Sequence, residues 1–183
     1  MGLTGLASFL MHPALPAPLT MAFFVGCNAT AAALAFSPVG ARLARGLAPV
    51  WLVAPQALRL PLELVLHEWA EQGVIPVQMT FEGHNFDIVT GTLALVLGLY
   101  ALWRVPPPGA VLAVNALGLA LLAAVGTIAV LSTPTPLRAY EGPPLLLAYH
   151  FPYGWIVPMC VAAALFAHLV AFRALRLEGR RSR

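Results

Sequence analysis

Five long apolar stretches constrain the fold of this chain more than any other feature. Each is close to the roughly 20 residues that an α-helix needs to cross a bilayer. Lipid offers no hydrogen-bond partners to exposed backbone, so stretches of this kind cross as helices. The sequence therefore predicts an all-α, polytopic transmembrane helix bundle of about five spans, a single integral membrane domain over 1–183. The predicted spans are 19–36, 47–69, 86–103, 110–131 and 153–175.

The second span differs from the others because it carries Pro49, Pro55 and Pro61. Proline removes a helical hydrogen bond and bends the backbone, so we expect this span to be kinked.

Composition excludes several classes of protein. Hydrophobic residues make up 60% of the chain and charged residues only 9%, too few to cover a soluble domain of 183 residues. All ten basic residues are arginine, which excludes Schiff-base chemistry on lysine. Most arginines lie beside apolar segments, where they act as topology signals and contact lipid headgroups. Membrane lipid is therefore the expected partner, and nucleic acid is not.

Arginine placement orients the predicted bundle. One side receives Arg138 as its single arginine, whereas the other side receives Arg42, Arg45, Arg104, Arg173, Arg176, Arg180, Arg181 and Arg183. The positive-inside rule then predicts a cytoplasmic C-terminus and an N-terminus outside, as an odd number of spans requires. The arginine-for-lysine and alanine-rich usage favours a multi-pass protein of the cell membrane, specifically a bacterial inner membrane.

The N-terminal stretch Met1–His12 lacks the basic region of a cleaved signal peptide. We expect it to form a short helix at the membrane interface instead.

Arg59, Glu63 and His67 form the strongest functional signal, since they are spaced by four residues within the second span. That spacing places them on one helix face, and Glu71 continues the row to the interface. Such residues are costly in lipid and usually face a bundle interior or a water-filled cavity. Two interpretations stay open. Arg59 and Glu63 could neutralise each other structurally, or Arg59 could anchor an anionic ligand while Glu63 and His67 bind a cation or carry protons.

Two loops on the predicted outer side add further candidates. Glu82 and His84 flank a glycine, and His150 precedes the last span. We expect all three to complete the mouth of the site, and for Glu82 and His84 a solvated loop without function is the alternative. Asn85 and Asp87 stand where the third span begins. For Asp87, capping of exposed backbone amides is the favoured interpretation.

Imidazole and carboxylate side chains also suggest a metal ion, with His67, Glu63 and His84 as the candidate ligands. Haem is the weaker candidate; it would need axial ligands at similar depth, such as His67 and His150. For His168, a hydrogen-bonded packing role is the favoured interpretation. The identity of any cofactor is left open.

No nucleophile elbow, P-loop or dinucleotide fingerprint occurs, so the sequence assigns no enzyme class. The leading hypothesis is a small membrane protein with a polar site in the outer half of its helix bundle. This site would bind an ion or small ligand, in connection with transport or redox reactions. A non-catalytic accessory subunit is the alternative. Stripes of small residues favour contact with other membrane subunits or with further copies of this chain. A membrane-embedded enzyme acting on a lipid or quinone is the third hypothesis.

Overall fold

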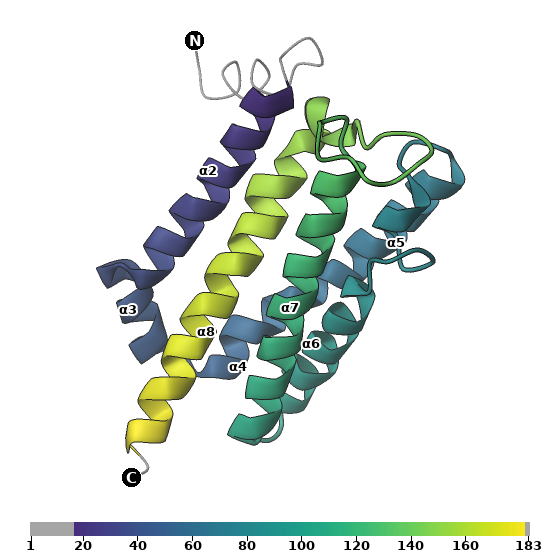
Figure 1. The fold of residues 1–183 in the computed structure, drawn as a ribbon. Coiled ribbons are helices and arrows are strands. Elements are labelled where there is room, and N and C mark those ends of the chain that lie inside the picture. Colours follow the sequence, from purple (N-terminus) through teal and green to yellow (C-terminus); the bar gives the residue numbers. More distant parts are fainter. Residues whose placement is uncertain (1–16, 182–183) are drawn as a thin grey trace.

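The computed structural model describes residues 17–181, and over that range the chain is helical with no strands. Its longest elements are α2 (Ala17–Phe36), α5 (Arg59–Glu71), α6 (Asp87–Ala101), α7 (Pro108–Ser132) and α8 (Ala162–Arg181), which form a bundle (Figure 1). The predicted all-α class is thereby confirmed. The interfacial helix predicted over Met1–His12 lies outside the described residues.

Four helical stretches are long and apolar enough to cross a membrane: Leu19–Phe36, Pro49–Glu71, Pro108–Ser132 and Tyr153–Arg180. The protein therefore has the helices of a membrane protein. The remaining predicted span, 86–103, contains α6, which has only 15 residues and is shorter than a typical spanning helix. Five spans and the inside–outside orientation stay predictions.

The second span is interrupted, as its prolines predicted. It consists of α4 (Pro49–Val53), the 3-10 turn η1 (Ala54–Leu58) and α5. Pro55 lies within η1, where its missing N–H leaves no α-helical hydrogen bond to break. Before α4, the short helix α3 (Pro38–Gly46) connects it to α2.

Short helical turns fill the connections that precede α6 and α8. They are η2 (Val77–Met79), η3 (Leu147–Tyr149), η4 (Tyr153–Trp155) and the π-turn η5 (Val157–Val161). The long connection from α7 to α8 lies at the same end of the bundle as the C-terminal end of α5, and the C-terminal end of α8 lies at the opposite end (Figure 1).

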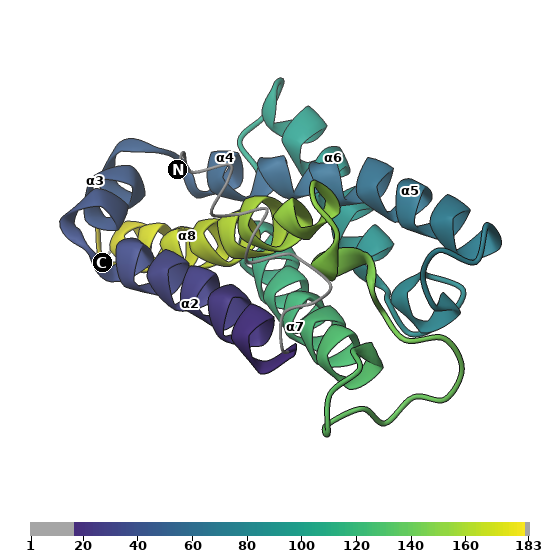
Figure 2. The same cartoon turned by 90° about the horizontal axis from the view of Figure 1, so that it is seen from above.

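Helix α8 occupies the middle of the bundle and packs against α2, α3, α4 and α7. Helices α5 and α6 pack together on the side of α8 that faces away from α2 (Figure 2). One apolar core surrounds Val53, Ala94 and Val170, and a second lies nearer the α7–α8 connection around Leu66 and Ile128. The bundle therefore has apolar packing near both ends, with a layer of buried polar residues around Arg59.

Three helices converge at Gly118 of α7. A Cβ atom on this residue would lie 2.6 Å from Cε1 of His168 on α8 and 2.8 Å from Cγ2 of Thr90 on α6. Close approach of this kind is how small residues set helix spacing in membrane bundles. Glycine is thus required here by the neighbouring side chains.

We expect Gly118→Ala to lower the free energy of unfolding by about 1–3 kcal/mol, the usual cost of overpacking. Gly126→Ala on the same helix is the matched control, because nothing lies within 4 Å of its added Cβ. Thermal unfolding in mild detergent measures both. Equal stability of the two variants would contradict the close packing at Gly118.

Candidate functional site

Arg59 lies at the start of α5 inside the bundle and is only 6% exposed. Its Nη1 donates to Asp87 Oδ1 at 2.6 Å and to the carbonyl oxygen of Gly118 at 3.2 Å. Asp87 begins α6 and Gly118 lies in α7, so one guanidinium connects three helices. The interpretation that Arg59 pairs with Glu63 on its own helix is therefore wrong. The carboxylate that it binds comes from a neighbouring helix.

His168 extends this network into α8 and is fully buried. Its Nε2 lies 3.2 Å from Arg59 Nη2, and its Nδ1 lies 2.9 Å from Asn115 Oδ1. A guanidinium can only donate, so Nε2 accepts and Nδ1 carries the proton that is donated to Asn115. Asn115 Nδ2 in turn donates to the His168 carbonyl at 3.1 Å. The predicted role of His168 as a hydrogen-bonded packing residue is confirmed, in its neutral form.

Glu63 is 2% exposed and lies one turn after Arg59 on α5. Its Oε1 accepts a hydrogen bond from Asn85 Nδ2 at 2.7 Å. Its Oε2 is enclosed and has no hydrogen-bond partner among the residues that the structure describes. A buried carboxylate oxygen without a donor is costly, so this atom requires an explanation.

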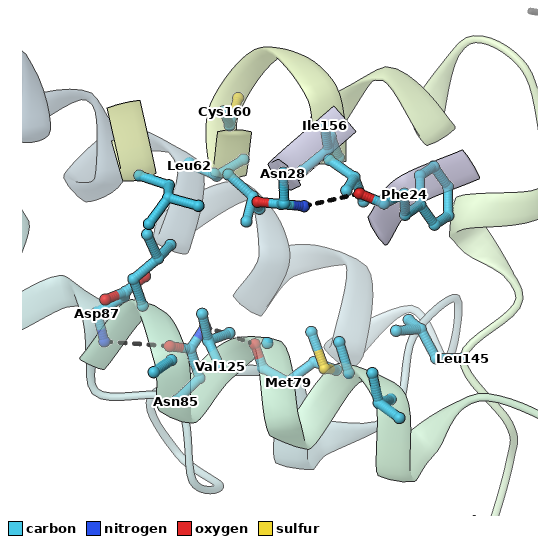
Figure 3. A pocket seen from close by; sticks show the side chains of 18 of the residues that line it. Phe24, Asn28, Leu62, Met79, Asn85, Asp87, Val125, Leu145, Ile156 and Cys160 are labelled. Carbon is cyan, nitrogen blue, oxygen red and sulfur yellow. Dashed lines mark hydrogen bonds between the residues drawn. The ribbon is translucent and has the colours of Figure 1, made fainter. Parts of the chain in front are cut away.

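Asn85 organises the start of α6. Its Nδ2 also donates to the Met79 carbonyl at 3.0 Å, and its Oδ1 accepts from the Asp87 amide at 3.1 Å (Figure 3). Asn85 therefore satisfies the first backbone amide of α6. The favoured capping role for Asp87 is wrong, because no backbone amide of the described residues donates to its carboxylate, whose Oδ1 is engaged with Arg59.

A cavity of about 640 Å³ opens beside these groups. Its wall is formed by α2, α5, the start of α6 with the connection before it, α7, and the α7–α8 connection with the start of α8, and it is largely apolar. Arg59, Glu63 and Asp87 are the charged residues of this wall among those described. In Figure 3, Asn85 and Asp87 lie on one side of the cavity, whereas Phe24 and Leu145 lie on the opposite side.

The two ends of the cavity differ in exposure. The charged residues and Asn85 are buried, whereas Val25 on α2, Ala123 on α7 and Cys160 before α8 are exposed and also belong to the wall. The cavity therefore runs from an apolar rim on the side of the bundle to a polar inner end.

A separate group lies toward the end of α5. His67, Glu71 and Glu82 place one potential ligand atom each within 4.8 Å of one another. His67 Nδ1 lies 4.0 Å from Glu82 Oε2, and its ring packs against Phe81 with centroids 4.7 Å apart.

The remaining predicted residues lie elsewhere. The ring of His84 packs against Tyr140 with centroids 5.7 Å apart, and His150 is exposed. Glu63 faces the cavity together with Arg59, whereas His67 joins Glu71 and Glu82. The row predicted on one face of the second span thus divides into two parts. Arg59 and Glu63 are buried, whereas His67 and Glu71 belong to the outer group.

Sequence reasoning missed two members of the buried network. Asn115 binds the ring and backbone of His168, and Asp87 is the partner of Arg59. The available signal was that Asn115 stands alone as an amide in the apolar segment 110–131. A polar side chain in such a segment needs a buried partner.

Breaking the central ion pair should be costly. We expect Asp87→Asn to lower the free energy of unfolding by about 3–5 kcal/mol, because Arg59 would be left as an uncompensated buried charge. Exposed Glu178→Gln is the control and should change stability by no more than about 0.5 kcal/mol. Denaturant unfolding in mild detergent measures the difference, and a wild-type value for Asp87→Asn would refute the pair.

A double-mutant cycle isolates the interaction itself. Arg59→Met combined with Asp87→Leu removes both charges, so the combined loss should be smaller than the sum of the two single losses. Additive losses would show that the two side chains act independently.

Comparisons with known proteins assign no family to the chain. No protein-family model, curated protein or solved structure matches the chain.

Proposed function

We propose that the protein binds an amphipathic small molecule in this cavity, with its apolar chain along the wall and its head group against Glu63. The head group would donate hydrogen bonds or carry a positive charge. The observation that supports this most directly is the enclosed Oε2 of Glu63, which lacks a partner among the described residues and belongs to the cavity wall.

Charge balance favours a donor or a cation. With both carboxyl groups ionised, the cavity wall carries one positive charge on Arg59 and two negative charges on Asp87 and Glu63. His168 is neutral in the hydrogen-bonding arrangement described above. Asp87 neutralises Arg59 directly, so the excess charge falls on Glu63. A proton, a cationic head group or a hydroxyl donor satisfies it, whereas an anionic head group would add to the repulsion.

Size and access support the apolar part of the ligand. A volume of about 640 Å³ lies within the usual range of roughly 300–1,000 Å³ for small-molecule pockets. The rim is formed by side chains such as Val25 and Cys160, which lie on helices that are long and apolar enough to span a membrane. A ligand dissolved in the bilayer could therefore enter sideways without crossing water.

Head-group selectivity tests the proposal. Dodecylamine, dodecanol and dodecanoate share a chain length and differ in head-group charge. We expect the amine to raise the melting temperature in a nonionic detergent most, the alcohol less and the carboxylate not at all. Glu63→Gln should weaken amine binding about tenfold or more, since a charge-assisted hydrogen bond contributes roughly 1.5–3 kcal/mol.

Glu68→Gln is the matched control, because Glu68 lies on the same helix but is exposed and lies outside the cavity wall. It should keep the wild-type order of the three probes. An unchanged preference for the amine in Glu63→Gln, or equal shifts from all three probes in the wild type, would overturn the proposal.

Blocking the rim tests the apolar part separately. Cys160→Trp should weaken binding of dodecylamine and dodecanol alike, because the indole would fill the cavity entrance. Neighbouring Met159→Trp should leave binding unchanged, since Met159 is 65% exposed and lies outside the cavity wall. Titration of the melting temperature against probe concentration measures both variants. Normal binding by Cys160→Trp would place the binding site elsewhere.

A further inference from the structure

The outer group on α5 differs chemically from the cavity. His67 and Glu71 are one turn apart and therefore share a helix face. Glu82 comes from the connection between η2 and α6 and reaches the same point. The three side chains thus bring an imidazole and two carboxylates together from two segments.

The connection that carries Glu82 is tightly closed. The amides of Gly83 and Asn85 both donate to the Thr80 carbonyl, at 3.0 and 3.1 Å. A Cβ atom on Gly83 would lie 2.5 Å from the Cα of Gln78, so only glycine fits. Glu82 is therefore presented from a defined turn.

His67 has an unexplained nitrogen at this point. Its Nδ1 is enclosed and has no hydrogen-bond partner among the described residues. The nearest carboxylate oxygen, Glu82 Oε2, is 4.0 Å away, which is too long for a hydrogen bond. Packing against Phe81 holds the ring in place. An atom between the nitrogen and the carboxylate would satisfy both.

We propose that His67, Glu71 and Glu82 bind a divalent transition-metal ion of the zinc or manganese class. Imidazole nitrogen and carboxylate oxygen are suitable ligands for both ions. Two ligand atoms on a tetrahedral zinc lie about 3.3 Å apart, given metal–ligand distances near 2.0–2.1 Å. The three ligand atoms lie within 4.8 Å of one another, and both glutamates are exposed and free to close on the ion.

The proposed ion has a structural consequence. Two carboxylates balance the charge of a divalent ion, and three protein ligands leave a coordination position open for water. The ion would also join α5 to the connection that contains Asn85, whose side chain holds Glu63. Metal binding should therefore make this connection more rigid, whether or not the cavity binds an amphiphile.

Zinc titration of the purified full chain in detergent tests the site. We expect one Zn²⁺ per chain, with the dissociation constant raised at least tenfold in His67→Ala and in Glu82→Gln. Zn²⁺ should also slow amide hydrogen exchange over residues 80–86 in the wild type. The controls His84→Ala and Glu68→Gln, which alter nearby side chains outside the group, should bind as the wild type does.

The outcomes that would overturn the proposal are distinct. Unchanged zinc affinity in both His67→Ala and Glu82→Gln would assign the ion to another part of the chain. Substoichiometric binding by the wild type would mean an adventitious ion only. Mg²⁺ in place of Zn²⁺ should bind at least tenfold more weakly, because it binds imidazole poorly, and equal affinity would likewise contradict the proposed ligand set.

Discussion

The guanidinium of Arg59 is the constraint on which the rest of the structure depends. A positive charge inside an apolar bundle is stable only when hydrogen bonds and an opposite charge surround it. Asp87, the Gly118 carbonyl and His168 supply these partners from three different helices. Helices α5, α6, α7 and α8 must therefore meet at this level. The glycine at position 118 allows them to do so.

The residues of this buried polar layer have two different roles, one structural and one in the proposed ligand binding. Arg59, Asp87, His168 and Asn115 satisfy one another, and their arrangement leaves little to be supplied by a ligand. Glu63 differs, because Asn85 engages only one of its oxygens. The second oxygen, Oε2, has no donor among the described residues, and Glu63 lines the cavity. The proposed ligand is therefore recognised by Glu63 and not by the ion pair of Arg59 and Asp87. Further along α5, His67 lies close to Glu71 and Glu82, in a separate group of potential metal ligands.

Much of the helical architecture was predictable from the apolar stretches. The segments 19–36 and 110–131 lie within α2 and α7, and the prolines of the second span marked its interruption. The polar row on α5 correctly indicated buried residues, since Arg59 and Glu63 are both buried. Its pairing was not predictable. A spacing of four shows which side chains share a face, but it does not show that Asp87 is closer to Arg59 than Glu63 is.

By itself, the sequence determined that the described chain forms apolar helices and that Arg59 and Glu63 need partners. Both conclusions follow from local chemistry, because the cost of placing backbone or charge in an apolar environment belongs to each segment alone. Tertiary structure decided which partners they find. That choice depends on which helix faces meet and how closely, so residues far apart in the sequence, such as Arg59 and His168, become neighbours only when the helices pack.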